Sequence, residues 1–218
     1  LKLALGTVQF GLPYGIANQS GQVSRDDAKT IISLARLCGI DTLDTAIAYG
    51  DSEACLGEIG VDDFKVITKL PAIPENVPDI ALWVQEQMQT SLQRLHMTSV
   101  YGLLLHRSQQ LLGDKGKALS MAIEQLKAEG VVQKFGVSIY APSELDNVMN
   151  VCQIDLVQAP FNLIDQRLYT SGWLKKLHDT GVGIHTRSAF LQGLLLMPKT
   201  EIPEKFKQWS SLWSIWHD

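Results

Sequence analysis

Charged residues, aromatic residues and cysteines are all modest in number in this 218-residue sequence. Charged residues make up 19% and aromatic residues 7% of it. Basic residues number 19 against 23 acidic ones, so the clustered positive charge of a nucleic-acid-binding surface is missing. No stretch approaches the roughly 20 apolar residues of a membrane span, and the apolar start of the chain lacks the basic lead-in of a signal peptide. We therefore expect a cytoplasmic protein that binds neither nucleic acid nor membranes.

The cysteines are too few and too scattered for a disulfide framework. Cys38, Cys55 and Cys152 are odd in number, lie far apart and contain no CxxC pair. Free thiols that pack as small apolar side chains in a reducing compartment are the simplest interpretation. The five histidines show neither HxH nor HExxH spacing, so no metal site is predicted and a metal-dependent hydrolase is disfavoured.

Seven short runs are apolar almost throughout and rich in leucine or β-branched residues. Such runs are typical of strands that are covered on both faces, because no solvent-facing side demands alternating polar positions. The predicted strands are Leu3–Thr7, Asp41–Asp44, Lys65–Lys69, Val100–His106, Lys134–Ser138, Asp155–Gln158 and Val182–Arg187.

Longer stretches with helical spacing of apolar residues separate these runs. Ser24 is the expected N-cap of the first helix, with Asp27 in the place of the usual glutamate of a capping box, and Gly39 suits its end. The other predicted helices cover residues 84–95, residues 119–126, a short stretch after Pro142, and Leu168–Asp179.

Alternating strands and helices predict parallel pairing, in a doubly wound sheet or a (β/α)8 TIM barrel. The first turn reads GTVQFGLPYG, which lacks the GxGxxG of a dinucleotide-binding doubly wound sheet. The barrel is therefore favoured, as a single domain over residues 1–218. Such a barrel takes about 250 residues, so we expect an incomplete one whose eighth strand–helix unit is missing at the C-terminus. An apolar helical face near the end needs a covering partner; it comprises Phe206, Trp209, Leu212, Trp213 and Trp216.

Polar side chains of four kinds follow three successive strands. Asp44, Lys69 and His106 stand at strand ends, and Tyr49 follows the first of them by five positions. Because these strand ends meet at one rim of a barrel, we expect an Asp44–Lys69 ion pair with Tyr49 beside it. A nearby ammonium favours the phenolate, which would bring the tyrosine pKa of about 10 closer to neutral pH. That suits general acid catalysis of carbonyl reduction, with the imidazole hydrogen-bonded to the carbonyl oxygen.

Several motifs in order along nearly the whole chain resemble those of the aldo-keto reductases. They read GIDTLDTAIAYGDSEACLG, VITKL, YGLLLH, KFGVSIY, DLVQAPFNLIDQR and RSAFLQGLL. The resemblance implies a (β/α)8 barrel that binds NADP(H), or alternatively NAD(H), and reduces an aldehyde or ketone to an alcohol. By position, Tyr49 is the proton donor, Lys69 lowers its pKa, Asp44 pairs with Lys69, and His106 orients the carbonyl.

The resemblance also implies a cofactor site. Ser138 and Gln158 are expected against the nicotinamide carboxamide, and the turn at Gly6 and Thr7 near the ring. The loop Ser188–Gly193 is expected to cradle the pyrophosphate through its backbone amides, with Phe190 and Gln192 in that loop.

Two positions depart from the family pattern. Ile139 stands where asparagine is common, which removes one amide from the carboxamide site. Arg187, followed by Ser188, stands where an aromatic residue usually stacks on the nicotinamide. A planar guanidinium can also stack, but its charge should favour NADPH over NADP+. The family holds the 2′-phosphate mainly after the eighth strand, so NADP(H) and NAD(H) both stay open.

The substrate side of the rim indicates a small carbonyl compound with an apolar face. The rim residues are Gln9, Phe10, Tyr14, Arg107, Tyr140 and Phe161. Two other functions stay open. Lys69 could form a Schiff base in a lyase, although a carboxylate partner would keep it charged. The barrel could also bind nicotinamide cofactors with little or no turnover.

Overall fold

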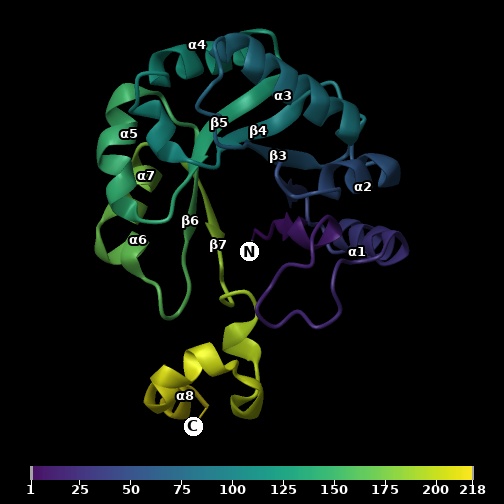
Figure 1. Ribbon diagram of the computed structural model, residues 1–218, viewed down its shortest axis with the longest axis vertical. Helices are drawn as coiled ribbons and strands as arrows, with labels where there is room; N and C mark the ends of the chain where they lie inside the picture. Colours follow the sequence, from purple (N-terminus) through teal and green to yellow (C-terminus); the bar gives the residue numbers. More distant parts are fainter. Residues whose placement is uncertain (1, 218) are drawn as a thin grey trace.

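The computed structural model describes residues 2–217, in which seven strands form one parallel sheet in chain order (Figure 1). Every strand pairs with the next one along the chain. The strands are β1 (Leu5–Gly6), β2 (Thr42–Asp44), β3 (Lys65–Leu70), β4 (Val100–Leu105), β5 (Val132–Ser138), β6 (Leu156–Pro160) and β7 (Gly183–Arg187). All seven predicted strands are confirmed, with bounds that shift by at most two residues.

The sheet curls as a (β/α)8 barrel does but stays open on one side. In the described residues, β1 pairs only with β2, and β7 pairs only with β6. Figure 1 shows the helices on the outside of the curled sheet. The predicted fold class, an incomplete barrel with seven strand–helix units, is confirmed.

Helices follow the strands as the alternating pattern predicts, although the helix after β2 is not among the predicted ones. They are α1 (Arg25–Leu37), α2 (Ser52–Ile59), α3 (Ile80–Leu95), α4 (Gly116–Ala128), α5 (Leu145–Val151), α6 (Arg167–Thr170), α7 (Trp173–Asp179) and α8 (Ser210–His217). The predicted helix Leu168–Asp179 is in fact two helices, because Gly172 takes a left-handed conformation with φ of 81° between them.

The N-terminus of α1 is capped as the sequence predicts, with one difference. The Ser24 hydroxyl oxygen accepts a hydrogen bond from the Asp27 backbone N–H at 3.1 Å. The Asp27 carboxylate, however, accepts from the Ser24 hydroxyl itself at 2.6 Å. The shorter aspartate side chain thus pairs with the capping hydroxyl, whereas a glutamate would reach back to the backbone.

Most of the core lies between the sheet and the outer helices, and a smaller cluster fills the barrel interior. That inner cluster contains Ile67, Leu104 and Leu156, with Tyr101 packed against it. It forms the floor below the polar residues at the strand ends.

The chain end forms a separate cluster beyond β7 (Figure 1). Trp213 is buried there against Leu194, Leu195, Met197 and Ile202. The predicted apolar helix is confirmed only from Ser210 onward, since Phe206 and Trp209 lie in a 3-10 segment, Glu204–Trp209.

The cysteines are free, and the expectation that they are buried is only partly right. Cys55 is buried and Cys152 half-buried, but Cys38 is exposed. Within residues 2–217 no helix is both long and apolar enough to cross a membrane. The same residues contain no cluster of three histidine, cysteine or acidic side chains placed to hold a metal ion.

Candidate active site

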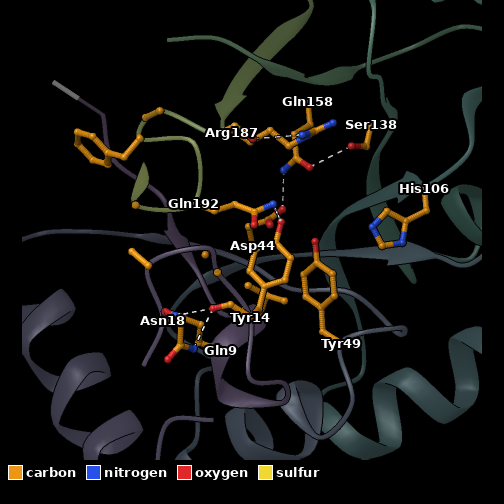
Figure 2. A pocket seen from close by; sticks show the side chains of 18 of the residues that line it. Gln9, Tyr14, Asn18, Asp44, Tyr49, His106, Ser138, Gln158, Arg187 and Gln192 are labelled. Atoms are coloured by element: carbon orange, nitrogen blue, oxygen red, sulfur yellow. Dashed lines mark hydrogen bonds between the residues drawn. The ribbon is translucent and has the colours of Figure 1, made fainter. Parts of the chain in front are cut away.

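A pocket of about 850 Å³ opens at the carboxyl ends of the strands (Figure 2). Three of the four predicted catalytic residues line it, namely Asp44, Tyr49 and His106. Seven of the eight predicted cofactor residues also line it: Gly6, Ser138, Gln158, Arg187, Ser188, Phe190 and Gln192. The barrel topology thus brings together residues that are up to 187 positions apart in the chain (Gly6 and Gly193).

The fourth predicted catalytic residue, Lys69, lies beneath the pocket wall and is completely buried. Its ammonium donates to the Oδ1 atom of Asp44 at 2.8 Å and to the Thr45 carbonyl oxygen at 2.7 Å. Adjacent parallel strands explain this contact, since β2 and β3 deliver both side chains to the same end of the sheet. The predicted ion pair is confirmed.

Tyr49 stands between Lys69 and His106 in the loop that joins β2 to α2. The Lys69 nitrogen lies 4.9 Å from the centroid of the Tyr49 ring. The His106 ring meets the Tyr49 ring edge to face, with centroids 5.7 Å apart. Figure 2 shows the Tyr49 hydroxyl pointing into the pocket. The four side chains therefore form one connected group.

The pKa of Tyr49 moves in the opposite direction from the one expected. Burial raises it, and the negative charge of Asp44 raises it further. The expected net lowering of this pKa by Lys69 is therefore not found, because burial has the largest effect and the charge of Asp44 acts in the same direction. The positive group that acts to lower the Tyr49 pKa is Arg187.

Burial also shifts the pKa values of the two neighbouring bases, Lys69 and His106. It lowers the pKa of Lys69, while Asp44 acts to raise it. Burial lowers the pKa of His106 to about 4, and the charge of Lys69 contributes in the same direction. The His106 imidazole is therefore neutral at pH 7, so it has one N–H to donate.

Thr7, expected near the nicotinamide ring, does not line the pocket. It is completely buried, and its hydroxyl donates to the Asp44 carbonyl oxygen at 3.0 Å. It also shares a hydrogen bond of 2.9 Å with the Ser52 hydroxyl, which lies 3.0 Å from the hydroxyl of Thr45. These three hydroxyls join β1 to the loop that carries Tyr49. Small polar residues near strand ends were the only sequence signal for this network.

The loop after β7 forms the roof of the pocket by touching the loop after β1. The side-chain amide of Gln192 donates to the Tyr14 hydroxyl at 2.7 Å, and its backbone carbonyl accepts from the Ala17 N–H at 3.1 Å. Below, the amides of Gln9 and Asn18 both donate to the Tyr14 carbonyl oxygen (Figure 2). The sequence predicts Tyr14 at the substrate rim, but no local pattern in it indicates this contact.

Arg187 occupies the pocket wall in a fixed orientation. Its guanidinium donates to the Ile139 carbonyl oxygen at 2.9 Å and to the Ser188 hydroxyl at 3.3 Å. The guanidinium carbon lies 4.7 Å from the centroid of the Tyr140 ring, which is a stacking distance. The Ile139 side chain is completely buried and does not line the pocket.

The predicted substrate rim is only partly correct. Gln9, Tyr14 and Tyr140 line the pocket. Phe10 is buried in the core instead, and Phe161 packs against that core. Arg107 is exposed outside the pocket.

Comparison with known proteins identifies the family. The sequence profile described as "Aldo/keto reductase family" matches residues 2–212. The chain belongs to the aldo/keto reductase family. It is 26% identical over 220 residues to the uncharacterized oxidoreductase YqkF of Bacillus subtilis, covering 95% of this chain and 71% of that protein.

Solved structures agree on the fold. A putative aldo-keto reductase from Pseudomonas aeruginosa superposes with a TM-score of 0.71 at 23% identity, over 91% of this chain and 74% of that one. The holo form of aldo-keto reductase AKR11C1 from Bacillus halodurans superposes with a TM-score of 0.74 at 22% identity, over 93% of this chain and 66% of that one. The glycerol dehydrogenase AKR11B4 from Gluconobacter oxydans superposes with a TM-score of 0.69 at 23% identity, over 93% of this chain and 67% of that one. The aldo/keto reductase chain described here is accordingly an oxidoreductase of the carbonyl-reducing kind.

Proposed function

We propose that this aldo/keto reductase reduces an aldehyde or ketone to an alcohol, with NADPH as hydride donor and Tyr49 as proton donor. The observation that carries the proposal is the connected group in the pocket. The Lys69 ammonium lies over one face of the Tyr49 ring, and the ring centroids of Tyr49 and His106 are 5.7 Å apart. Asp44 holds Lys69 in place. The pocket is large enough for a cofactor headgroup and a small substrate together.

The residues around the pocket fit a nicotinamide nucleotide. Ser138 and Gln158 offer a hydroxyl and a primary amide, which match the donor and acceptor of a carboxamide. The loop after β7 contains left-handed Ser188, Gln192 and Gly193, and turns of this kind present backbone N–H groups to anions. Aldo-keto reductases generally use NADP(H), and a holo form has been solved for the neighbour from Bacillus halodurans.

The protein's own residues supply orientation and the proton. When bound, the reduced nicotinamide supplies the hydride. The neutral His106 donates an N–H to the substrate oxygen and fixes the direction of the carbonyl. Tyr49 transfers its proton to that oxygen as negative charge develops there. The raised Tyr49 pKa keeps the phenol protonated beforehand, and an alkoxide is a stronger base than a phenolate, so the transfer is still downhill.

The proposal is tested by binding and turnover measured on the same preparation. NADPH is titrated while the nicotinamide fluorescence is followed, and a panel of small aldehydes and ketones is then assayed for NADPH consumption. We expect saturable binding and turnover of at least one carbonyl compound. Saturable NADPH binding without turnover would favour a non-catalytic, nicotinamide-binding barrel. No NADPH binding would contradict both the reductase and the non-catalytic alternative.

A Schiff-base lyase is favoured by one observation, the burial that lowers the Lys69 pKa. The same burial argues against a Schiff base on Lys69, because this side chain is fully enclosed. Both of its hydrogen-bond acceptors, Asp44 and the Thr45 carbonyl oxygen, lie within the protein. Borohydride trapping with the carbonyl panel distinguishes the two reactions, because only the lyase leaves a covalent adduct on Lys69.

A further inference from the structure

One hydrogen bond in the barrel interior connects the expected cofactor side to the catalytic ion pair. The Nε2 atom of Gln158 donates to the Oδ1 atom of Asp44 at 2.7 Å, between residues 114 positions apart. Gln158 belongs to β6 and Asp44 to β2, and these strands are not neighbours in the sheet. The bond therefore spans the barrel from one wall to another (Figure 2).

The Gln158 amide is itself held in one orientation. Its Oε1 atom accepts from the Ser138 hydroxyl at 3.2 Å, and Ser138 is paired with Gln158 in the register of β5 and β6. The Asp44 carboxylate can only accept, so the amide must direct its NH2 toward Asp44. Gln158 is buried, which leaves its side chain few other conformations.

Asp44 needs such support because it lies at the pocket wall. Its side chain is 18% exposed, whereas that of Lys69 is fully enclosed. The single oxygen Oδ1 accepts from both Lys69 and Gln158, at 2.8 and 2.7 Å. Without the amide, the carboxylate could rotate toward solvent in the pocket and leave the lysine ammonium without its counter-charge.

We propose that Gln158 is a positioning residue that holds Asp44 across the barrel on Lys69, and thereby keeps the ammonium against the ring of Tyr49. This role is additional to any contact of Gln158 with a cofactor. The catalytic consequence rests on the proposed function, but the positioning itself is a property of the cofactor-free protein.

The first test needs no cofactor. The Lys69 side chain is titrated by NMR in wild-type protein, in Gln158→Ala and in the control Gln125→Ala, which removes an exposed amide on α4. Asp44 acts to raise the Lys69 pKa, so Gln158→Ala is expected to lower that pKa further. Gln125→Ala should leave it unchanged. An unchanged Lys69 titration in a folded Gln158→Ala protein would overturn the proposal.

The variant Gln158→Glu provides a rescue experiment. At pH 8 its carboxylate repels Asp44, so the variant should resemble Gln158→Ala. At about pH 5 the two close carboxyl groups share a proton, and the protonated one can donate across the barrel as the amide does. We expect the hydride-transfer rate, relative to wild type at the same pH, to recover at least threefold on acidification. A constant ratio would contradict the proposal.

Kinetics separate positioning from a simple cofactor contact. If Gln158 only holds the cofactor, Gln158→Ala raises the Kd for NADPH and leaves kcat at saturating NADPH unchanged. The positioning role predicts a loss of kcat of about tenfold or more at saturation. Should wild-type protein show no turnover, the proposed function fails, while the Lys69 titration still decides the positioning role.

Discussion

The ammonium nitrogen of Lys69 lies 4.9 Å from the centroid of the Tyr49 ring, over its face. A cation in that place attracts the ring by about 0.5–2 kcal/mol, depending on desolvation. Because the same nitrogen also bonds to Asp44 and to the Thr45 carbonyl, Lys69 connects the tyrosine ring to the end of β2. Its clearest effect in this structure is to fix the position of the phenol, and its influence on the phenol pKa is secondary.

Removal of the Tyr49 hydroxyl should abolish reduction without removing the pocket. We expect Tyr49→Phe to lower kcat by about 10²- to 10⁴-fold, the usual contribution of a positioned general acid. The Kd for NADPH should change by less than about threefold, because the ring keeps its contacts with Lys69 and His106. Tyr169→Phe, at an exposed position on α6, is the control. Near-normal kcat in Tyr49→Phe would remove Tyr49 from the mechanism.

The low pKa of His106 should make folding stability depend on pH. Its pKa is about 4 in the folded protein and about 6.5 in an unfolded chain. Between these values the unfolded chain binds more protons, so the free energy of unfolding rises with pH across the window and is lost as pH falls toward 4. His185, whose pKa burial also lowers, acts in the same direction.

Urea unfolding at pH 4.5 and pH 7 tests this dependence. We expect His106→Gln to reduce the difference in unfolding free energy between the two pH values. His178→Gln, at an exposed position on α7, should leave that difference as in wild type. Equal pH dependence in His106→Gln and wild type would show that this imidazole does not titrate with the stated pKa.

The strands and the catalytic group could be predicted because both follow from local pattern. A strand of a parallel sheet reads as a short apolar run, and Asp44, Lys69 and His106 each stand at or directly after the end of such a run. Parallel topology then places their side chains at one rim. The helix α2 was missed because Ser52 and Glu53 are buried in it, which removes the polar-outward pattern of a surface helix.

The remaining features depend on three-dimensional proximity that no local pattern encodes. The Gln192–Tyr14 bond joins residues 178 positions apart, and the Gln158–Asp44 bond joins residues 114 positions apart. The direction of the Tyr49 pKa likewise depends on how deeply the phenol is buried, which outweighs the charges around it.

The contact between the roof loops should control cofactor affinity. A Cβ atom on Gly193 would lie 2.5 Å from the Cβ atom of Ala17, and Gly193 has φ of +87°. Gly193→Ala must therefore push the loop after β7 away from the loop after β1. Gly181→Ala is a matched control, since Gly181 has φ of +74° and open space around it. Both variants carry the strain of a left-handed alanine.

Only Gly193→Ala should weaken NADPH binding. We expect a rise in Kd of about tenfold, corresponding to about 1.4 kcal/mol, and a faster release of NADPH in stopped-flow fluorescence. Gly181→Ala should bind NADPH as wild type does, although it should lose about as much folding stability as Gly193→Ala. If the two variants bind NADPH equally well, the roof contact has no part in retaining the cofactor.

Arg187 should make the protein prefer the reduced cofactor. Its guanidinium is fixed by the Ile139 carbonyl and the Tyr140 ring, so it cannot easily withdraw from a positively charged nicotinamide. We expect the ratio of Kd for NADP+ to Kd for NADPH to fall by about three- to tenfold in Arg187→Tyr, since about 1 kcal/mol of charge repulsion is removed. Arg187→Lys, which keeps the charge, should retain most of the preference. Calorimetry with both cofactors gives this ratio for wild type and for each variant, and identical ratios in all three proteins would contradict the charge effect.

Glu53 should stabilise the fold through a buried carboxylate at the joint of α2, β3 and α3. It is completely buried, and its Oε1 atom accepts from the Thr68 hydroxyl at 2.7 Å and from the Ser91 hydroxyl at 2.6 Å. Glu53→Ala leaves both hydroxyls without their acceptor and creates a cavity, so we expect a loss of about 3 kcal/mol in unfolding free energy.

Two further variants separate the effect of the Glu53 carboxylate from the effect of the side-chain volume. Glu53→Gln keeps an oxygen for the two hydroxyls but turns its NH2 toward the Arg94 guanidinium, which donates to the Oε2 atom of Glu53 at 3.5 Å, so it should lose some stability but less than Glu53→Ala. Glu58→Ala removes an exposed carboxylate on the same helix that pairs with Arg25, and exposed ion pairs contribute little. Denaturant unfolding of the three variants ranks them, and a loss in Glu53→Ala no larger than that in Glu58→Ala would show that the buried carboxylate does not hold α2 in place.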